Sequence, residues 1–292
     1  MSFSSEIKNK LCTIALPCSP CCSAELSGIF RFSAGIDPSQ IKIITENQQV
    51  AGRIEDDIRE VFGWEMRPEH RPQSRSFQFL IQDTNRVENI LAQLMLGQED
   101  IGSLMPFTCC RASYVRGAFL GGGSVNDPQK SYHLEFDTKY QQEAQLLQKV
   151  LQEEGIGAKV TYRKGHYIVY LKESDAIAGI LGWIGAGQGA LELYTVQVEK
   201  DMRNTVNRQV NCETANVEKV AKAASRHVRA IEKIKREKGL SYLPDTLREI
   251  AELRLAYPED SLKELGERLQ PAIGKSGVNH RLARILEIAR EL

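Results

Sequence analysis

The 292-residue sequence lacks several features that would assign it to a class at once. No stretch approaches the roughly 20 apolar residues that a membrane-spanning helix requires. The first ten residues are polar and charged, with no apolar signal-peptide core behind them. The 38 Lys and Arg residues balance 38 Asp and Glu residues, which excludes a uniformly basic protein but permits a local basic face. We therefore expect a cytoplasmic protein without a membrane partner, and the length favours about two domains.

The sequence also lacks a complete motif for a metal or a nucleotide. Cys18 and Cys21 have the spacing of half a zinc site, but no second CxxC or HxxxH pair follows nearby. The glycine-rich stretch at residues 185–189 follows a helical pattern and lacks the GxGxxG spacing of a dinucleotide loop. We expect no cofactor and no metal. In a reducing cytosol the seven cysteines are interpreted as reduced thiols, with a zinc or redox role as the alternative.

One stretch that is present organises the chain, the apolar helical pattern ASYVRGAFLGGGSV at residues 112–125. Glycine has no Cβ and lets a second backbone approach closely, so Gly117 and the glycines at residues 121–123 suit a tightly packed helix pair. The pattern resembles the signature helix of LAGLIDADG homing endonucleases, whose paired helices join two pseudo-symmetric halves. In that register the metal-binding acid of the endonucleases falls on Gly122.

A degenerate repeat precedes this stretch. Cys21 and Cys22 precede the helical pattern at residues 24–33 much as Cys109 and Cys110 precede the second one. Alternating and amphipathic patterns predict strands at residues 40–46, 75–81, 132–136, 159–163 and 166–171, and helices at 48–62, 84–96, 140–154 and 174–183. The predicted fold class is α+β. We expect one LAGLIDADG-like repeat at residues 1–108 and a second at 109–195.

The composition changes at about residue 201. From Arg203 to Lys238 ten Lys and Arg residues stand against four Glu residues, and no Gly or Pro interrupts the stretch. The pattern predicts a basic linker helix within residues 196–240. It is either an ordinary solvated face or a surface that follows the DNA backbone, because phosphate contacts need clustered Lys and Arg. Arg203 and Arg208 are the candidate phosphate contacts.

Residues 241–292 predict a compact module of three helices. Ser261 and Glu264 form a capping box before the second helix. The third helix begins with Lys-Ser-Gly, and its helical spacing turns Val278, Leu282, Ile285 and Ala289 inward. This arrangement is typical of a helix-turn-helix, which inserts the start of its last helix into the major groove. A helical packing or dimerisation domain is the alternative. The predicted DNA-binding residues of the module are Lys263, Lys275, Ser276, Asn279, His280, Arg281 and Arg284.

Several strings together resemble the WhiA family along essentially the whole chain. They are the paired cysteines, residues 114–125, residues 202–216 (MRNTVNRQVNCETAN), residues 261–266 (SLKELG) and residues 274–282 (GKSGVNHRL). The resemblance implies a bacterial DNA-binding transcriptional regulator, linked to sporulation, cell division and chromosome segregation. It also implies double-stranded promoter DNA as the partner, a location at the nucleoid, and other transcription regulators or RNA polymerase as candidate partners.

The signature helices lack the acids that a LAGLIDADG nuclease requires. One acid from each helix would hold divalent metals at the phosphodiester. The matching positions are Gly122 and either Ser33 or Ala34, so we expect no catalytic residues and no enzyme. Two alternatives remain, an active or divergent homing endonuclease or RNA maturase, and a protein-binding scaffold. The first 200 residues hold 20 basic and 24 acidic residues. This balance disfavours a strong phosphate-binding surface there, although Arg31, Arg75, Lys130, Lys139, Arg163, Lys164 and His166 are available.

Overall fold

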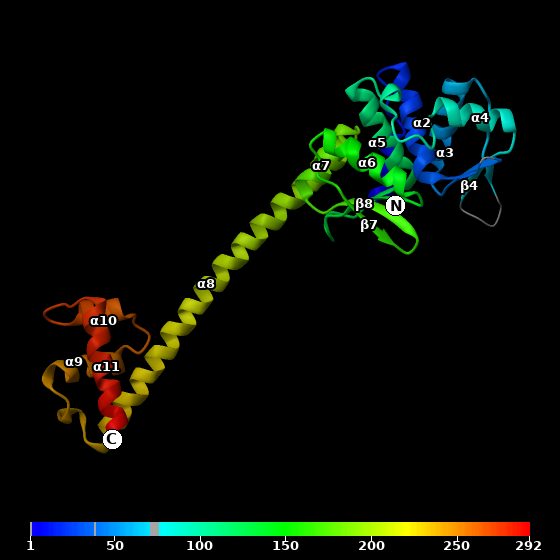
Figure 1. Cartoon of the computed structure of the whole chain (residues 1–292). Coiled ribbons are helices and arrows are strands. Elements are labelled where there is room, and N and C mark those ends of the chain that lie inside the picture. The colour runs from blue at the N-terminus through cyan, green and yellow to red at the C-terminus, as the bar shows by residue number, and fades with distance from the viewer. Residues whose placement is uncertain (1, 38, 71–75) are drawn as a thin grey trace. The chain divides into compact units, whose positions relative to one another are not determined.

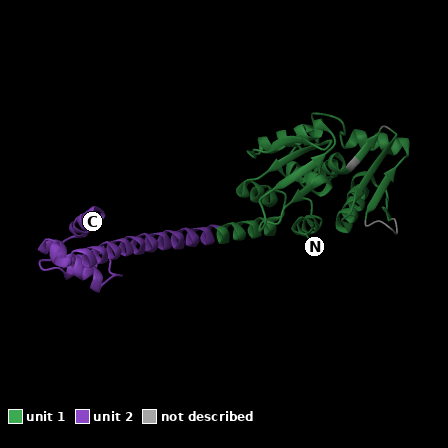
Figure 2. Cartoon of the chain, turned by 90° about the horizontal axis from the view of Figure 1, so that it is seen from below, with its two compact units in different colours: residues 1–200 green, residues 201–292 purple. Residues whose placement is uncertain are grey.

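The computed structural model describes residues 2–37, 39–70 and 76–292. The chain divides into two compact units, residues 1–200 and 201–292 (Figure 2). The long helix α8 (Gly187–Glu237) begins in the first unit and continues into the second. Within the described part of the chain, no helix has both the length and the apolar character needed to cross a membrane.

The first unit contains two repeats of the same plan, preceded by the short helix α1 (Phe3–Leu11). Each repeat begins with a helix, followed by a strand hairpin, a second helix, a further strand pair and a third helix. The first repeat comprises α2 (Ser19–Ser33), β1 (Ala34–Asp37), β2 (Gln40–Thr45), α3 (Gln48–Phe62), β3 (Glu69–His70), β4 (Phe77–Ile81) and α4 (Thr84–Gln93). After the short 3-10 turn η1 (Gly102–Leu104), the second comprises α5 (Thr108–Gly122), β5 (Gly123–Val125), β6 (Leu134–Thr138), α6 (Gln141–Glu153), β7 (Lys159–Arg163), β8 (His166–Leu171) and α7 (Ser174–Trp183).

The two sheets have the same topology, and all of their strand pairs are antiparallel. Their strand orders are β1-β2-β4-β3 and β5-β6-β8-β7. In β6 the buried residues Leu134, Phe136 and Thr138 alternate with half-buried ones, as expected for a strand with one face on the core. The predicted α+β class and the repeat are therefore confirmed.

Local sequence signals explain where the helices begin and end. The Asn47 side chain accepts hydrogen bonds from the backbone N–H groups of Gln49 and Val50, and Gly63 ends α3 in the left-handed conformation. The Asp83 side chain caps α4 in the same way. The bounds of α3 predicted from its amphipathic pattern match the structure.

Helices α2 and α5 pack side by side at the centre of the first unit (Figure 1). A Cβ added at Gly117 would lie under 3.0 Å from the Glu25 carbonyl oxygen, and one at Gly28 under 3.0 Å from the Tyr114 carbonyl oxygen. The two contacts are reciprocal, since Gly28 and Gly117 occupy equivalent positions in the two helices. The glycines therefore set the register of the repeat. Cys21 is equivalent to Cys110 in this register, and the two are 89 residues apart.

Charged side chains are buried beside this helix pair. Glu25 is fully buried, and its two carboxylate oxygens accept from Arg53 Nε at 2.7 Å and from Arg116 Nε at 2.5 Å. Asp57 lies 3.2 Å from Arg53 Nε, and burial together with the charge of Glu25 raises the pKa of Asp57 to about 8. Arg31 is also buried, where it pairs with Glu143. Arg31 and Arg116, the buried arginines of this unit, therefore each lie against a buried carboxylate, as burial of charge requires.

The second unit continues from α8 through the 3-10 turn η2 (Leu240–Tyr242) into α9 (Asp245–Ala256), α10 (Leu262–Arg268) and α11 (Lys275–Glu291). These three helices and the end of α8 enclose one apolar core. The Ser261–Glu264 capping box is present as predicted. Arg254, only 2% exposed, donates to the carbonyl oxygens of Pro258 and Asp260 and thereby fixes the connection between α9 and α10.

Several sequence predictions need correction. The paired cysteines do not precede the signature helices but lie in their first turns. The linker helix α8 begins at Gly187 and not within residues 196–240 as predicted, so residues 187–189 of the glycine-rich stretch are helical. Gly185, which has a positive φ, lies between α7 and α8. Strand β4 begins at Phe77, and Arg75 falls outside the described residues.

We predict that acid destabilises the second unit through His227. This side chain is 7% exposed, and burial and the charges of Arg254 and Arg226 lower its pKa to about 4. The unfolded chain, with a His pKa near 6.5, binds more protons than the folded one, so the stabilisation present above pH 6.5 is lost as pH falls toward 4. The expected loss between pH 7 and pH 4 is up to about 3 kcal/mol.

The pH prediction is checked by urea unfolding at several pH values. Both tryptophans, Trp64 and Trp183, belong to the first unit, so fluorescence reports on that unit while helix content reports on both. His227→Gln should flatten the pH dependence of the transition that circular dichroism detects without a fluorescence change. An unaltered pH dependence in this variant would contradict the assignment.

Candidate nucleic-acid interface

Helix α11 has one buried face and one polar, solvent-facing face. Val278, Leu282, Ile285 and Ala289 are buried, as the sequence predicted. The spacing of these residues leaves the opposite side of the helix to polar and charged residues. Near the start of α11, that side carries the side chains that the sequence analysis assigned to DNA.

Most of the predicted contact residues are free to meet a ligand. Lys275, Ser276, Asn279, His280 and Arg284 are exposed on α11, and Lys263 is exposed on α10. Arg284 Nη1 lies 2.7 Å from Glu287 Oε2, and Lys263 Nζ lies 3.7 Å from Glu267 Oε1. Both pairs are exposed, and such pairs contribute at most about 1 kcal/mol, so they break readily when a phosphate or base competes.

Arg281 differs from the other predicted contacts. It is half-buried, and its Nη1 donates to the Thr246 carbonyl oxygen at the start of α9, at a distance of 3.4 Å. It therefore holds α11 against α9 in addition to any contact with a ligand. A substitution at Arg281 would change packing as well as binding, so Asn279 is the better test position.

The start of α11 is itself suited to an anion. Gly274 is its N-cap residue and provides no side-chain hydrogen bond, so the first backbone N–H groups of the helix are left without a capping partner. Such groups, together with the helix dipole, favour phosphate. Lys275 and Ser276 flank this end of the helix.

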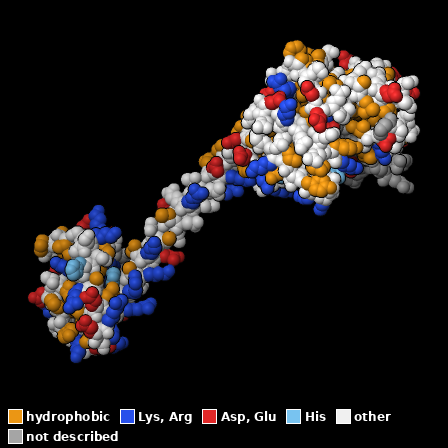
Figure 3. Space-filling model, in the orientation of Figure 1, with side chains coloured by type: hydrophobic (Ala, Val, Ile, Leu, Met, Phe, Trp, Pro, Cys, Tyr) orange, Lys and Arg blue, Asp and Glu red, His pale blue; other side chains and the backbone are white. Residues whose placement is uncertain are grey.

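The linker helix contributes a basic surface over part of its length. Every residue from 201 to 220 is exposed, including Arg203 and Arg208. Lys and Arg side chains gather along the part of α8 that belongs to the second unit (Figure 3). The exposed apolar residues Met202, Val206 and Val210 lie among them, so this section is less uniformly polar than a phosphate-binding helix requires. A count of charges along the sequence does not reveal this apolar row.

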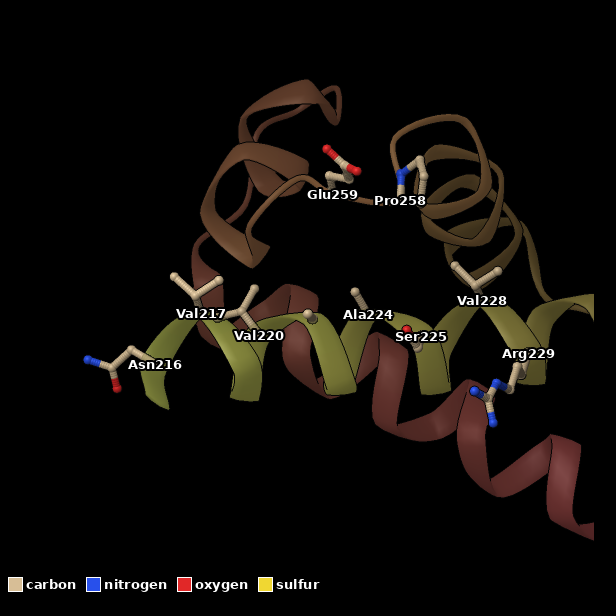
Figure 4. A pocket seen from close by; sticks show the side chains of 10 residues that line it. Asn216, Val217, Val220, Ala224, Ser225, Val228, Arg229, Pro258 and Glu259 are labelled. Atoms are coloured by element: carbon tan, nitrogen blue, oxygen red, sulfur yellow. The ribbon is translucent and has the colours of Figure 1, made fainter. Parts of the chain in front are cut away.

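A groove of about 820 Å³ lies within the second unit. Val217, Val220 and Val228 point from α8 toward the connection that carries Pro258 and Glu259 (Figure 4). The lining is mainly apolar, and Arg229 is the one basic side chain among the described residues that form it. The groove therefore does not resemble a phosphate-binding surface.

In the first unit, the end of the α2–α5 pair lacks the acids of a nuclease. The glycine register assigns Ser33 rather than Ala34 as the equivalent of Gly122. The Ser33 hydroxyl donates to the Ile29 carbonyl oxygen at 2.6 Å. A Cβ at Gly122 would lie under 3.0 Å from the carbonyl oxygens of both Asp137 and Phe32. Neither position offers a carboxylate, and Gly122 has no space for one, so these residues do not fit the divalent metals of a LAGLIDADG nuclease.

One carboxylate near this end was missed in the sequence. Asp137 pairs with His166 Nδ1, and both line a hollow of about 350 Å³ with Lys42 and Lys139. Asp137 is the only acid among its lining residues in the described part of the chain. Arg31, which the sequence analysis offered for DNA, also reaches this hollow but is 1% exposed and paired with Glu143. It belongs to the core.

Two protein-family descriptions match this chain. The "WhiA LAGLIDADG-like domain" matches residues 111–203, and the "WhiA C-terminal HTH domain" matches residues 206–289. The second match contains all of α9, α10 and most of α11.

Relatives of known name match over their full length. The "Probable cell division protein WhiA" of Alkaliphilus oremlandii is 42% identical over 313 aligned positions, covering 100% of this chain and 98% of the relative. The protein of the same name from Clostridium botulinum is 41% identical and covers 100% and 99%. Among solved structures, full-length DUF199/WhiA from Thermatoga maritima has a TM-score of 0.63 at 26% identity, covering 100% of this chain and 99% of that one. The N-terminal LAGLIDADG domain of DUF199/WhiA has a TM-score of 0.51 at 20% identity, covering 63% and 90%, which supports the fold alone.

Proposed function

Because the chain belongs to the WhiA family, we propose that it is a sequence-specific DNA-binding transcriptional regulator with a role in cell division. The observation that carries the proposal is the exposed polar face at the start of α11, with Lys275, Ser276 and Asn279 above a fully buried apolar face. In a helix-turn-helix these are the positions that enter the major groove. The partner would be double-stranded promoter DNA, which places the protein at the nucleoid.

In this proposal different residues have different tasks. Asn279, His280 and Arg284 contact base edges, since an amide can bond adenine bidentately and a guanidinium can bond guanine. Lys263, Lys275 and Ser276, with Arg203 and Arg208 on α8, contact phosphates and set the position of the module without reading sequence. Arg281 orients α11 through Thr246 and reaches DNA from that position.

The LAGLIDADG-like unit is proposed to be non-catalytic. Support comes from Gly122, where no side chain fits, and from Ser33, whose hydroxyl is bonded within its own helix. The nuclease or maturase alternative would need an acid from each helix. Incubation of the full chain with its bound DNA and Mg²⁺ or Mn²⁺ should leave the DNA intact, and site-specific cleavage would reverse this assignment.

The scaffold alternative has one specific observation in its favour, the exposed apolar row Met202, Val206 and Val210 on α8. It fits a contact with another transcription regulator or with RNA polymerase as well as a purely structural role. Genome-wide mapping of bound DNA distinguishes a DNA-binding regulator from a protein-binding scaffold, because a scaffold without DNA contacts would give no reproducible sites.

We predict that Asn279→Ala weakens binding to a mapped site by about 1–3 kcal/mol, the range for one lost base contact, without weakening binding to scrambled DNA. Lys275→Ala should weaken binding to both DNAs. It should also reduce the slope of the logarithm of the binding constant against the logarithm of the salt concentration by about one. Fluorescence anisotropy with labelled duplexes measures each. Arg290→Ala is the control, since Arg290 is exposed at the far end of the same helix. If Asn279→Ala binds like wild type, α11 is not the recognition helix.

A further inference from the structure

Four cysteine sulfurs meet at the N-terminal ends of the paired helices. Cys18 immediately precedes α2, Cys21 lies in the first turn of α2, and Cys109 and Cys110 lie in the first turn of α5. Their Sγ atoms all lie within 4.8 Å of one another. Among the described residues, this is the single group of three or more His, Cys, Asp or Glu side chains placed closely enough to hold a metal ion.

The spacing of the sulfurs fits one tetrahedral ion. Four sulfurs at the usual zinc–sulfur distance of about 2.3 Å lie about 3.8 Å apart along each edge of the tetrahedron. Cys18 Sγ is 3.7 Å from the Sγ atoms of both Cys109 and Cys110, and Cys21 Sγ is 3.8 Å from Cys110 Sγ. Cys18 and Cys21 are closer, at 3.2 Å, but well beyond the roughly 2.05 Å of a disulfide. We propose that Cys18, Cys21, Cys109 and Cys110 bind one zinc ion as a structural site.

The chemistry of the site selects zinc. Thiolates are soft ligands, and a tetrahedral set of four sulfurs is typical of zinc or an iron–sulfur centre. A cluster of several irons holds its cysteines further apart, whereas these sulfurs leave room for a single ion. When Zn²⁺ binds, each coordinated thiol loses its proton to solvent, and four zinc–sulfur bonds form without any change of oxidation state.

The surroundings suit the resulting charge of minus two. Both helices begin at the cluster, and their dipoles favour negative charge there. The Ser113 side chain hydrogen-bonds Cys21, and its oxygen accepts from Arg116 Nη2 at 3.1 Å. A buried guanidinium therefore acts on the site through one hydroxyl, as outer groups do at many metal sites.

The site lies at the opposite end of the helix pair from Gly122 and Ser33, so it is unrelated to the metal position of the nucleases. Cys21 and Cys110, both fully buried, are equivalent in the repeat, whereas Cys18 and Cys109 each have no cysteine at the matching position. Four protein ligands leave no open coordination position, which is the mark of a structural rather than a catalytic zinc. The ion would join the starts of the two repeats.

The first test uses the full-length wild-type protein. Elemental analysis after purification under reducing conditions should find about one zinc per chain, and X-ray absorption should find four sulfurs at about 2.3 Å. Substitution with Co²⁺ should give the visible bands of a tetrahedral thiolate complex. Protein that binds neither zinc nor cobalt, or that contains a Cys18–Cys21 disulfide when purified, overturns the proposal, and iron in the four-sulfur site overturns the choice of zinc.

Variants locate the ligands. Cys18→Ser and Cys109→Ser alter the two half-buried ligands, and each should lower zinc occupancy at least tenfold under competition with a chelator. With zinc present, each variant should also have a lower Tm than the wild-type protein. Cys22→Ala is the matched control, because Cys22 neighbours Cys21 but its Sγ faces Asp57, 3.6 Å away. Cys212→Ser, at an exposed position, is a second control. Equal zinc retention in the ligand and control variants would refute the assignment.

Discussion

Replacing Gly117 with alanine should destabilise the first unit by about 3 kcal/mol or more. The new methyl group would lie under 3.0 Å from the Glu25 carbonyl oxygen. It would also lie 3.0 Å from the Ile29 backbone nitrogen, which is closer than an ordinary van der Waals contact. Backbone atoms cannot rotate away as a flexible side chain does, so α2 and α5 must separate along their length. Overpacking of a core ordinarily costs about 1–3 kcal/mol, and a clash of backbone with backbone belongs at or above the top of that range.

The measurement is urea or thermal unfolding followed by tryptophan fluorescence. The control is Gly52→Ala, because Gly52 lies inside α3 and nothing surrounds its added Cβ within 4 Å. Alanine there should stabilise the protein by about 0.4–1 kcal/mol, through reduced freedom of the unfolded chain. Gly28→Ala should resemble Gly117→Ala, and the double variant should cost less than the sum, because helices that have already moved apart accommodate both methyl groups. If Gly117→Ala unfolds like wild type, the close packing of α2 and α5 is wrong.

The sequence predicts the parts of this fold whose signals are local. Helix α3 was placed correctly from its amphipathic pattern, and local caps at Asn47 and Gly63 fix its ends. The inward face of α11 was predicted because Val278, Leu282, Ile285 and Ala289 repeat at helical spacing. The strands β1, β3 and β5 were missed, and each is at most four residues long. Such strands form because a neighbouring strand supplies hydrogen bonds, which no alternation of their own residues indicates.

The features that depend on distant contacts were less accessible. Arg31 was named only among the basic residues available to DNA, and an arginine is usually exposed. It is buried because Glu143 on α6 and two backbone carbonyl groups receive its guanidinium. The seven cysteines were interpreted as reduced thiols, with a zinc or redox role as the alternative, because no second pair follows Cys18 and Cys21 nearby. Cys109 and Cys110 lie about 90 residues from Cys18. Only the pairing of α2 with α5 brings them together, and the repeat that predicts this pairing was the available signal.

The sequence indicates the position of the candidate DNA interface but does not distinguish the roles of its residues. The order of polar residues at the start of α11 is local and visible in the sequence. The contact of Arg281 with Thr246 is not, because it joins the last helix to the start of α9. Sequence alone therefore ranks Arg281 and Asn279 equally, whereas the structure makes Asn279 the residue whose removal disturbs only the outer surface.

Glu25→Leu should destabilise the first unit by about 3–5 kcal/mol, because it leaves the buried Arg116 and the half-buried Arg53 without their shared carboxylate. Arg116→Met should also be costly, since Glu25 then keeps only Arg53. The control is Asp56→Ala, which removes an exposed pair with Arg59 and should cost less than about 1 kcal/mol. Unfolding followed by tryptophan fluorescence measures each variant.

The double variant Glu25→Leu with Arg116→Met tests why the pair is costly to break. If the penalty comes from a charge left unpaired, removing both partners should destabilise the protein by less than the two single changes together. If the penalty came from lost packing alone, the two costs would add, because each substitution removes its own contacts. Strong non-additivity is the expected result, since Glu25 and Arg116 lie on the two signature helices and are almost completely excluded from water. The ion pair between Glu25 and Arg116 then fixes the relative alignment of α2 and α5 that their glycines permit. Removing either partner alone destabilises the unit, because the remaining charge is buried without its partner.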